Sequence, residues 1–124
     1  MVNVEKINDK EKLYRAIHPI FWKNDLNKPS TAAFKDSKGV SVDRDGGREE
    51  KEVIAVFDKK KPNYGLASIT AKSCREIGTH PIPKPLDDNI YHAEIHDSED
   101  KIRISMSKLK KIIDSIYIVE EPNF

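Results

Sequence analysis

With 124 residues, the chain is long enough for one domain that buries roughly two-thirds of the surface of its unfolded form. Its 22 basic and 21 acidic residues leave no net field that would draw the whole chain to nucleic acid or an anionic membrane. The single cysteine, Cys74, excludes an intramolecular disulfide, and no apolar run approaches the roughly 20 residues that cross a bilayer. Because the N-terminus also lacks a secretory signal, we expect a soluble cytoplasmic protein.

The first segment with a clear pattern is residues 13–18, which indicates a strand or the end of a helix. In extended form, Arg15 shares a face with aliphatic side chains, so its charge must be paired with an acid such as Asp43 or lie at the rim of a pocket. Pro19 ends the segment. The aromatic-rich residues 20–22 that follow are expected to anchor in the core.

The middle of the chain begins with a strand, a turn and a second strand, predicted within residues 30–43. Acidic residues then precede apolar residues at helical spacing, which predicts a helix over 48–58, with a strand at 53–57 as the alternative. Three lysines at 59–61 follow, and such a triplet is more typical of a solvated loop than of a phosphate clamp.

A strand that leads directly into a helix is predicted next. Residues 66–69 have the composition of a buried strand, Thr70 is a suitable N-cap, and Gly78 closes a helix over 71–77. Cys74 falls in the middle of this helix, where a small buried apolar residue is the ordinary interpretation.

The last third combines a proline-rich segment with a second strand and helix. The prolines at 81, 83 and 85 predict an irregular extended segment along a sheet edge. A strand over 89–96 follows, and residues 102–106 alternate in a way that suits pairing with it as a hairpin. Apolar residues then recur every three and four positions and predict a packing helix over 107–116, followed at 117–119 by a short strand or a helix extension.

The strand over 89–96 places three possible metal ligands on one face: His92, Glu94 and His96. The two histidines would lie roughly 13 Å apart along an ideal strand, which is too far for both to bind one metal. Nothing in the spacing brings a histidine close to Cys74, and the sequence has no phosphate-binding or dinucleotide-binding loop. We therefore expect neither a metal nor a cofactor.

Five short motifs lie between residues 13 and 95. They are Leu-Tyr-Arg-x-Ile-His-Pro at 13–19, Pro-Ser-Thr-x-Ala-Phe at 29–34, Ser-Val-Asp at 41–43, Ile-Thr-Ala at 69–71 and Asn-x-x-His-Ala at 89–93. Together they resemble a group of small uncharacterised bacterial proteins, from whose pattern Thr31 and Ile90 depart by standing where a second serine and a proline are usual. The resemblance implies a shared small fold and a polar cluster, but no reaction. It marks six candidate site residues: Arg15, His18, Ser30, Ser41, Asp43 and His92.

These patterns favour a single α+β domain over residues 1–124, with flexible ends at 1–8 and 120–124. Its expected architecture is a small mixed sheet of short strands with two or three helices packed on one side.

For function, the sequence favours an accessory or binding protein that acts through a protein partner in a bacterial defence or toxin–antitoxin setting. Whether it is an enzyme stays open. The order of residues faintly resembles the Arg, Ser-Thr-Ser and Glu order of ADP-ribosyltransferases, with Arg15, Ser30–Thr31 and Glu94 at the corresponding places. A small enzyme using Arg15, Ser30 and His92 is thus the alternative, and nucleic-acid binding through the lysines at 59–61 and 108–111 ranks third. An enzyme requires the candidate residues to converge in an open pocket, whereas a partner-binding protein requires an exposed apolar patch.

Overall fold

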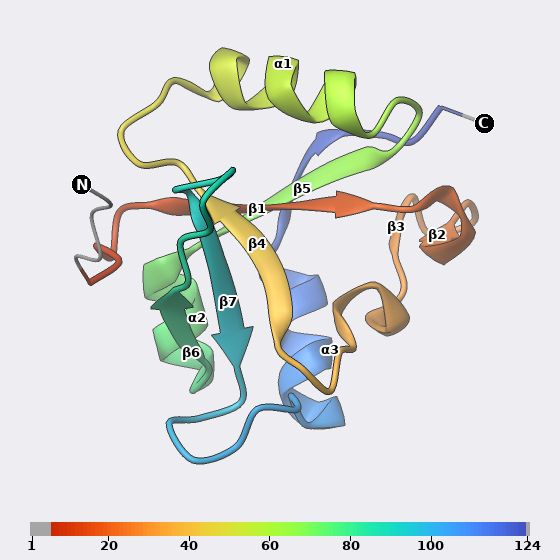
Figure 1. Cartoon of the computed structure of the whole chain (residues 1–124). Coiled ribbons are helices and arrows are strands. Elements are labelled where there is room, and N and C mark those ends of the chain that lie inside the picture. The colour runs from red at the N-terminus through yellow and green to blue at the C-terminus, as the bar shows by residue number, and fades with distance from the viewer. Residues whose placement is uncertain (1–5, 124) are drawn as a thin grey trace.

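The computed structural model describes residues 6–123, which form a six-stranded antiparallel sheet, a two-stranded ribbon and three α-helices (Figure 1). The strands are β1 (Lys12–Ile17), β2 (Trp22–Lys23), β3 (Lys28–Pro29), β4 (Val40–Arg44), β5 (Gly65–Thr70), β6 (His80–Pro83), β7 (His92–His96) and β8 (Tyr117–Glu120). The α-helices are α1 (Glu50–Lys60), α2 (Ala71–Ile77) and α3 (Met106–Ser115), and two 3-10 turns are η1 (Pro19–Phe21) and η2 (Thr31–Phe34). The order in the large sheet is β6-β7-β4-β1-β5-β8. The predicted α+β class is confirmed, but the sheet is antiparallel rather than mixed.

The helices cover both faces of the sheet. On one face, aliphatic side chains such as Leu13 and Ile17 pack with α2 and α3 in the main core. On the other face, Tyr14 and Leu66 pack beneath Val53 of α1. Of the two or three helices predicted on one side, α2 and α3 lie together there, whereas α1 lies on the opposite face (Figure 1).

Helix α2 begins and ends where its local sequence predicts. The Thr70 hydroxyl accepts a hydrogen bond from the N–H of Ser73 (3.1 Å), which supplies the N-cap. At the other end, Gly78 adopts a φ of 98° and donates its N–H to the carbonyls of Cys74 and Arg75. The strand and helix predicted over 66–77 are confirmed, as are the helices predicted over 48–58 and 107–116, within a few residues at their ends.

Three local predictions were wrong. Residues 31–34 form the turn η2 rather than a strand, and of residues 20–22 only Trp22 enters the core, while Ile20 and Phe21 are exposed. Residues 102–106 do not pair with β7, because the Asp97 carboxylate accepts the N–H of Ser105 (2.8 Å) and the chain turns there into α3. A loop anchored by this bond replaces the expected hairpin.

Strand β6 forms one edge of the sheet although two of its four residues are proline. The adjacent Lys84 donates its N–H to the carbonyl of His92 (3.0 Å), so the alternation of the strand turns the nitrogens of Pro81 and Pro83 away from β7. Proline is tolerated only where no ladder donor is needed, which is the outer side of an edge strand. The predicted edge position is confirmed, whereas the predicted lack of regular structure was wrong.

The sheet splits between its two central strands. β1 pairs with β5 over all six of its residues, but with β4 only through Leu13–Arg44 and Tyr14–Asp43. Beyond that point β4 turns away from β1 (Figure 1), and the chain from η1 to η2 enters the gap and buries Phe34 there. This split creates the site described below.

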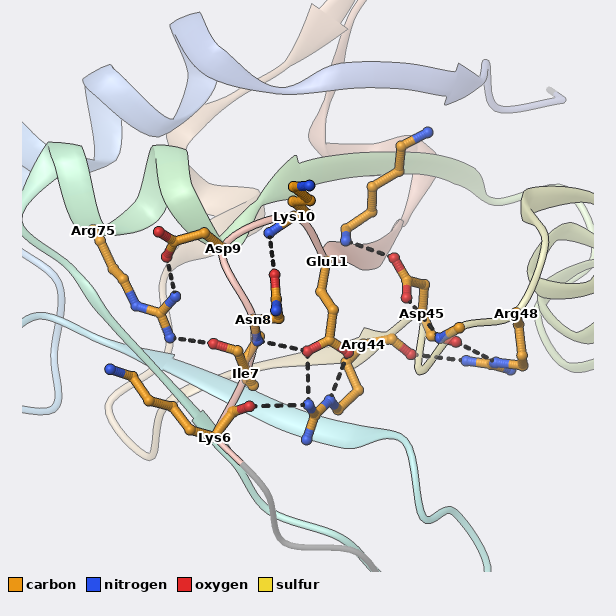
Figure 2. A network of polar contacts seen from close by, with 12 residues as sticks. Lys6, Ile7, Asn8, Asp9, Lys10, Glu11, Arg44, Asp45, Arg48 and Arg75 are labelled. Carbon is orange, nitrogen blue, oxygen red and sulfur yellow. Dashed lines mark hydrogen bonds and ion pairs between the residues drawn. The ribbon is translucent and has the colours of Figure 1, made fainter.

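A polar network fastens the described N-terminal residues to the sheet and to α2 (Figure 2). Arg44 binds both carboxylate oxygens of Glu11 at 2.9 and 2.6 Å, and Arg75 pairs with Asp9 and donates to the carbonyl of Ile7. Burial raises the pKa of Glu11, but the hydrogen bond and charge of Arg44, with nearby N–H groups, outweigh it and leave that pKa below its ordinary value.

Residues near both ends of the described chain contact the folded domain. Residues 1–5 and 124, which belong to the predicted flexible ends, lie outside the described residues. Ile7 lies in the core with only 1% of its surface exposed, and Pro122 packs against Gly65. Within residues 6–123, no helix has the length and apolar character needed to span a membrane.

Candidate functional site: a cleft at the split between β1 and β4

A cleft of about 570 Å³ opens where β1 and β4 separate, which is a volume typical of small-molecule sites. Its walls come from β1, η1, β4, β7 and the turn after α1. Five of the six candidate residues line it: Arg15, His18, Ser41, Asp43 and His92. The sixth, Ser30, does not line it; its N–H donates to the carbonyl of Phe21 (2.7 Å).

Arg15 bridges the split. Its Nε and Nη1 donate to the carbonyls of Ala33 and Ser41, both at 2.7 Å, and its guanidinium carbon lies 5.6 Å from the centre of the Phe34 ring. The predicted acidic partner was therefore wrong, because two main-chain carbonyls take the place of a carboxylate. Burial lowers the pKa of Arg15, and the charge of Asp36 opposes this. Among the described residues, Nη2 has no hydrogen-bond partner.

His92 lines the cleft, and its hydrogen bond determines which ring nitrogen carries the proton. Its Nδ1 lies 2.9 Å from the carbonyl of Lys84, and since a carbonyl can only accept, Nδ1 carries the proton. In the neutral ring, Nε2 is then a lone-pair acceptor. The carboxylate of Asp43 lies directly across the strand pair on the same face of the sheet.

His18 has the opposite tautomer. Its Nδ1 accepts the N–H of Ile20 at 3.0 Å, so in the neutral ring the proton is on Nε2. The ring meets Tyr64 edge-on with centres 4.9 Å apart. The two histidines of the cleft therefore offer one donor, at His18, and one acceptor, at His92.

The remaining candidates on the sheet lie beside His92. Ser41 is exposed on β4 two residues before Asp43, so both side chains share a face. Asp43 accepts a hydrogen bond from the side-chain amide of Asn89 (2.9 Å), which leaves its second carboxylate oxygen for other partners. Lys61 and Tyr64 also line the cleft and were not predicted, because nothing in the sequence shows that the turn after α1 faces β1.

The predicted face of β7 is confirmed, and its histidines are divided between two environments. Glu94 and His96 bind each other at 2.8 Å and do not line the cleft. The arrangement that faintly resembled ADP-ribosyltransferases is therefore not assembled, since neither Ser30 nor Glu94 reaches the cleft with Arg15.

Other chemical candidates have structural roles. Cys74 is buried, and burial raises the pKa of its thiol to about 12, so it is protonated at neutral pH. No cluster of metal ligands occurs in residues 6–123. The exposed lysines at 59–60 and 110–111 belong to α1 and α3, which cover opposite faces of the sheet and so do not form one basic surface.

The cleft thus combines hydrogen-bond donors for an anion, at Arg15, His18 and Lys61, with two acceptors, at Asp43 and His92. Such a set can hold a negatively charged oxygen at one point while removing a proton at another. Comparison with protein-family models, with curated proteins and with solved structures finds no match to this chain.

Proposed function

We propose that the chain is a small enzyme that binds a hydroxyl-bearing organic anion in the cleft and uses Nε2 of His92 as a general base. The observation that carries this proposal is the opposite tautomers of the two cleft histidines, each set by a main-chain group. One ring then supplies an acceptor nitrogen that can serve as a general base, and the other supplies an N–H that can donate to the oxygen left behind.

The charges of the cleft favour an anion. Arg15 and Lys61 are cationic, and Asp43 is the one carboxylate among the lining residues. Arg15 is also fixed by its two carbonyl bonds, so it is already oriented when a ligand arrives. A preoriented donor stabilises a developing negative charge more effectively than one that must first reorganise.

In the proposed step, His92 removes the proton from a hydroxyl of the ligand or of a bound water. The O–H bond breaks, a bond forms between Nε2 and the proton, and Nδ1–H keeps its hydrogen bond to the Lys84 carbonyl. The resulting imidazolium lies beside the Asp43 carboxylate, which stabilises its charge. The oxygen left behind accepts hydrogen bonds from Nε2–H of His18 and Nη2 of Arg15.

Long-range 1H–15N correlation spectra of the histidine rings test this assignment without knowledge of the ligand. At a pH high enough for neutral imidazoles, His92 is expected to give the Nδ1–H pattern and His18 the Nε2–H pattern. His92→Asn and His18→Asn assign the signals. An Nε2–H pattern for His92 would remove the base from the cleft and reject the proposal.

Titration with citrate and with tricarballylate, which differ by one hydroxyl, tests the ligand class. Citrate is expected to shift the signals of His92 and Ile20, and tricarballylate to bind several-fold more weakly because it leaves the acceptors unpaired. His92→Asn should remove the preference for citrate, and His80→Asn, outside the cleft, should keep it. Equal binding of the two anions would contradict the proposed class.

We propose as a second function the binding of a protein partner, in the defence or toxin–antitoxin setting predicted from the sequence. The observation that favours it is the exposure of Ile20 (77%), two residues before Trp22, and of Leu26 (53%), four residues after it. Copurification from the native host with the wild type, the double variant Ile20→Ser/Leu26→Ser and His92→Asn tests it. A partner that copurifies with the wild type and with His92→Asn, but not with the double variant, supports this role. A partner that copurifies equally with all three proteins opposes it.

A further inference from the structure

We propose that His18 is a pH-sensitive latch that holds one wall of the cleft in place and releases it when the ring is protonated. The wall is the 3-10 turn η1, residues 19–21, and we refer to it as the arm. Ile20 and Phe21 of the arm line the cleft, so the position of the arm sets the shape of the site. The inference rests on the proposed function only in taking this cleft as the ligand site.

The geometry of η1 gives His18 a specific task. Pro19 has no N–H, and Phe21 donates its N–H to the carbonyl of His18 (2.9 Å). Ile20 therefore carries the one N–H among these three residues that needs a side-chain acceptor, and Nδ1 of His18 supplies it at 3.0 Å. An imidazole as N-cap differs from the usual Ser, Thr, Asp or Asn because its acceptor atom can bind a proton.

Protonation converts the capping bond into a clash of donors. With a proton on Nδ1, two N–H groups face each other, so the ring must rotate away from Ile20. That rotation also removes the edge-on contact of the His18 ring with Tyr64, at 4.9 Å, which links the end of β1 to the turn after α1. Loss of both contacts loosens the arm at its first residues, while the carbonyl of Phe21 keeps its hydrogen bond from the N–H of Ser30.

The charged surroundings of His18 come from several elements. Lys61 lies 5.3 Å from the centre of the Tyr64 ring in the turn after α1, and Arg15, Asp43 and His92 line the same cleft from β1, β4 and β7. No carboxylate of the described residues is paired with the His18 ring, so protonation gains no ion pair that would replace the lost cap. The neutral ring is thus the form that closes the arm.

The chain contains its own reporter of arm position. Trp22, the single tryptophan, follows η1 directly, donates its N–H to the carbonyl of Pro19 and is 9% exposed. Movement of the arm lets water approach the neighbouring indole, and its fluorescence emission shifts to longer wavelength.

The experiment follows Trp22 emission and hydrogen exchange of the Ile20 amide between about pH 8 and pH 5, the range in which imidazoles titrate. His18→Asn is the decisive variant, because asparagine caps a helix end without titrating in this range. The wild type should show a red shift at low pH, and its Ile20 amide should exchange roughly fivefold faster than that of His18→Asn at the same pH, as expected for loss of a cap. His92→Asn, in the same cleft, should behave as the wild type does.

Absence of a pH-dependent change in the wild type, or the same change in His18→Asn, would overturn the latch. If His18→Asn proves unfolded by circular dichroism, His18→Ser supplies a second cap that does not titrate, and the same comparison applies. The latch can fail while the proposed function survives, because the histidine tautomers and the preference for citrate are measured at a pH where the arm is closed.

Discussion

At the scale of single residues, the main lesson of this chain is that a buried charge can be satisfied by the backbone. Arg15 lies on a strand between aliphatic neighbours, and a sequence pattern correctly indicates that its charge needs partners. Its partners are the carbonyl of Ser41, which is free because β1 and β4 separate at that point, and the carbonyl of Ala33, which belongs to η2. An unpaired carbonyl leaves no mark in a sequence, so the predicted acidic partner was wrong even though the location at a pocket was confirmed.

Arg15→Lys tests how far this bridge stabilises the fold. Lysine keeps the charge but has one donor atom, so it cannot reach both carbonyls with the fixed geometry of a guanidinium. We expect the free energy of unfolding to fall by about 1.5–3 kcal/mol, the range for hydrogen bonds to charged groups. Urea unfolding followed by Trp22 fluorescence measures it, with the exposed Arg103→Lys as the matched control. A loss no larger than that of the control would show that the bridge is dispensable.

At the scale of elements, the turn between β4 and α1 is fixed by a close packing arrangement. The guanidinium of Arg48 lies 3.6 Å from the centre of the Tyr91 ring, and Gly46, with a φ of 59°, lies against the same ring. A Cβ at Gly46 would come within 2.5 Å of Tyr91, whereas a Cβ at Gly47, with a φ of 85°, would meet no atom within 4 Å. The turn therefore contains two glycines in the left-handed region, of which one is also needed for space.

Gly46→Ala and Gly47→Ala form a matched pair that separates these two requirements. Both substitutions place a side chain at positive φ, but only the first displaces Tyr91. We expect Gly46→Ala to cost about 1–3 kcal/mol more than Gly47→Ala, the range for overpacking a filled site. Thermal or urea unfolding of both variants measures the difference, and equal losses would mean that Tyr91 moves aside freely.

Prediction from the sequence succeeded where an element is determined by its own residues. Helix α2 is set by the cap at Thr70 and the stop at Gly78, both local features. The loop at 102–106 was mistaken for a strand because its alternation is local, whereas the carboxylate of Asp97 that redirects it is not part of the pattern. Prediction of where the site residues lie also succeeded for local features and failed for those that depend on the tertiary arrangement. Strand alternation predicted the outward face of His92, but its approach to His18 depends on the order of strands in the sheet.

At the scale of the whole molecule, the network in Figure 2 joins the start of the described chain to β4 and α2. Its central pair, Glu11 and Arg44, has side chains that are each 12% exposed. Because the pKa of Glu11 is below its ordinary value of 4.5 in the folded protein, the proton binds more weakly to the folded than to the unfolded chain. The contribution of the Glu11 charge to stability is therefore complete at pH values above its ordinary pKa. It disappears as the pH falls through the lower pKa of Glu11 in the folded protein.

Glu11→Gln is expected to lower the free energy of unfolding at pH 7 by about 1–2 kcal/mol, after allowance for partial screening by solvent. The difference between wild type and variant should shrink as the pH falls below the ordinary value of 4.5, where the unfolded chain takes up the proton, and should disappear once the folded protein is protonated too. Urea unfolding at several pH values measures this, with Glu99→Gln, at an exposed position, as control. A difference that stays constant down to pH 3 would show that the charge of Glu11 does not matter.

The prolines of β6 give the molecule one edge at which it cannot grow. A neighbouring chain that adds a strand to a sheet needs outward N–H donors as well as carbonyls, and Pro81 and Pro83 remove the donors from that side. At the opposite edge of the described sheet, β8 has no proline within Tyr117–Glu120. Strand-to-strand association through this sheet is thus limited to β8, and two chains joined there would turn their proline edges outward. Such contact ends at a pair, so the fold resists continuous stacking into fibres.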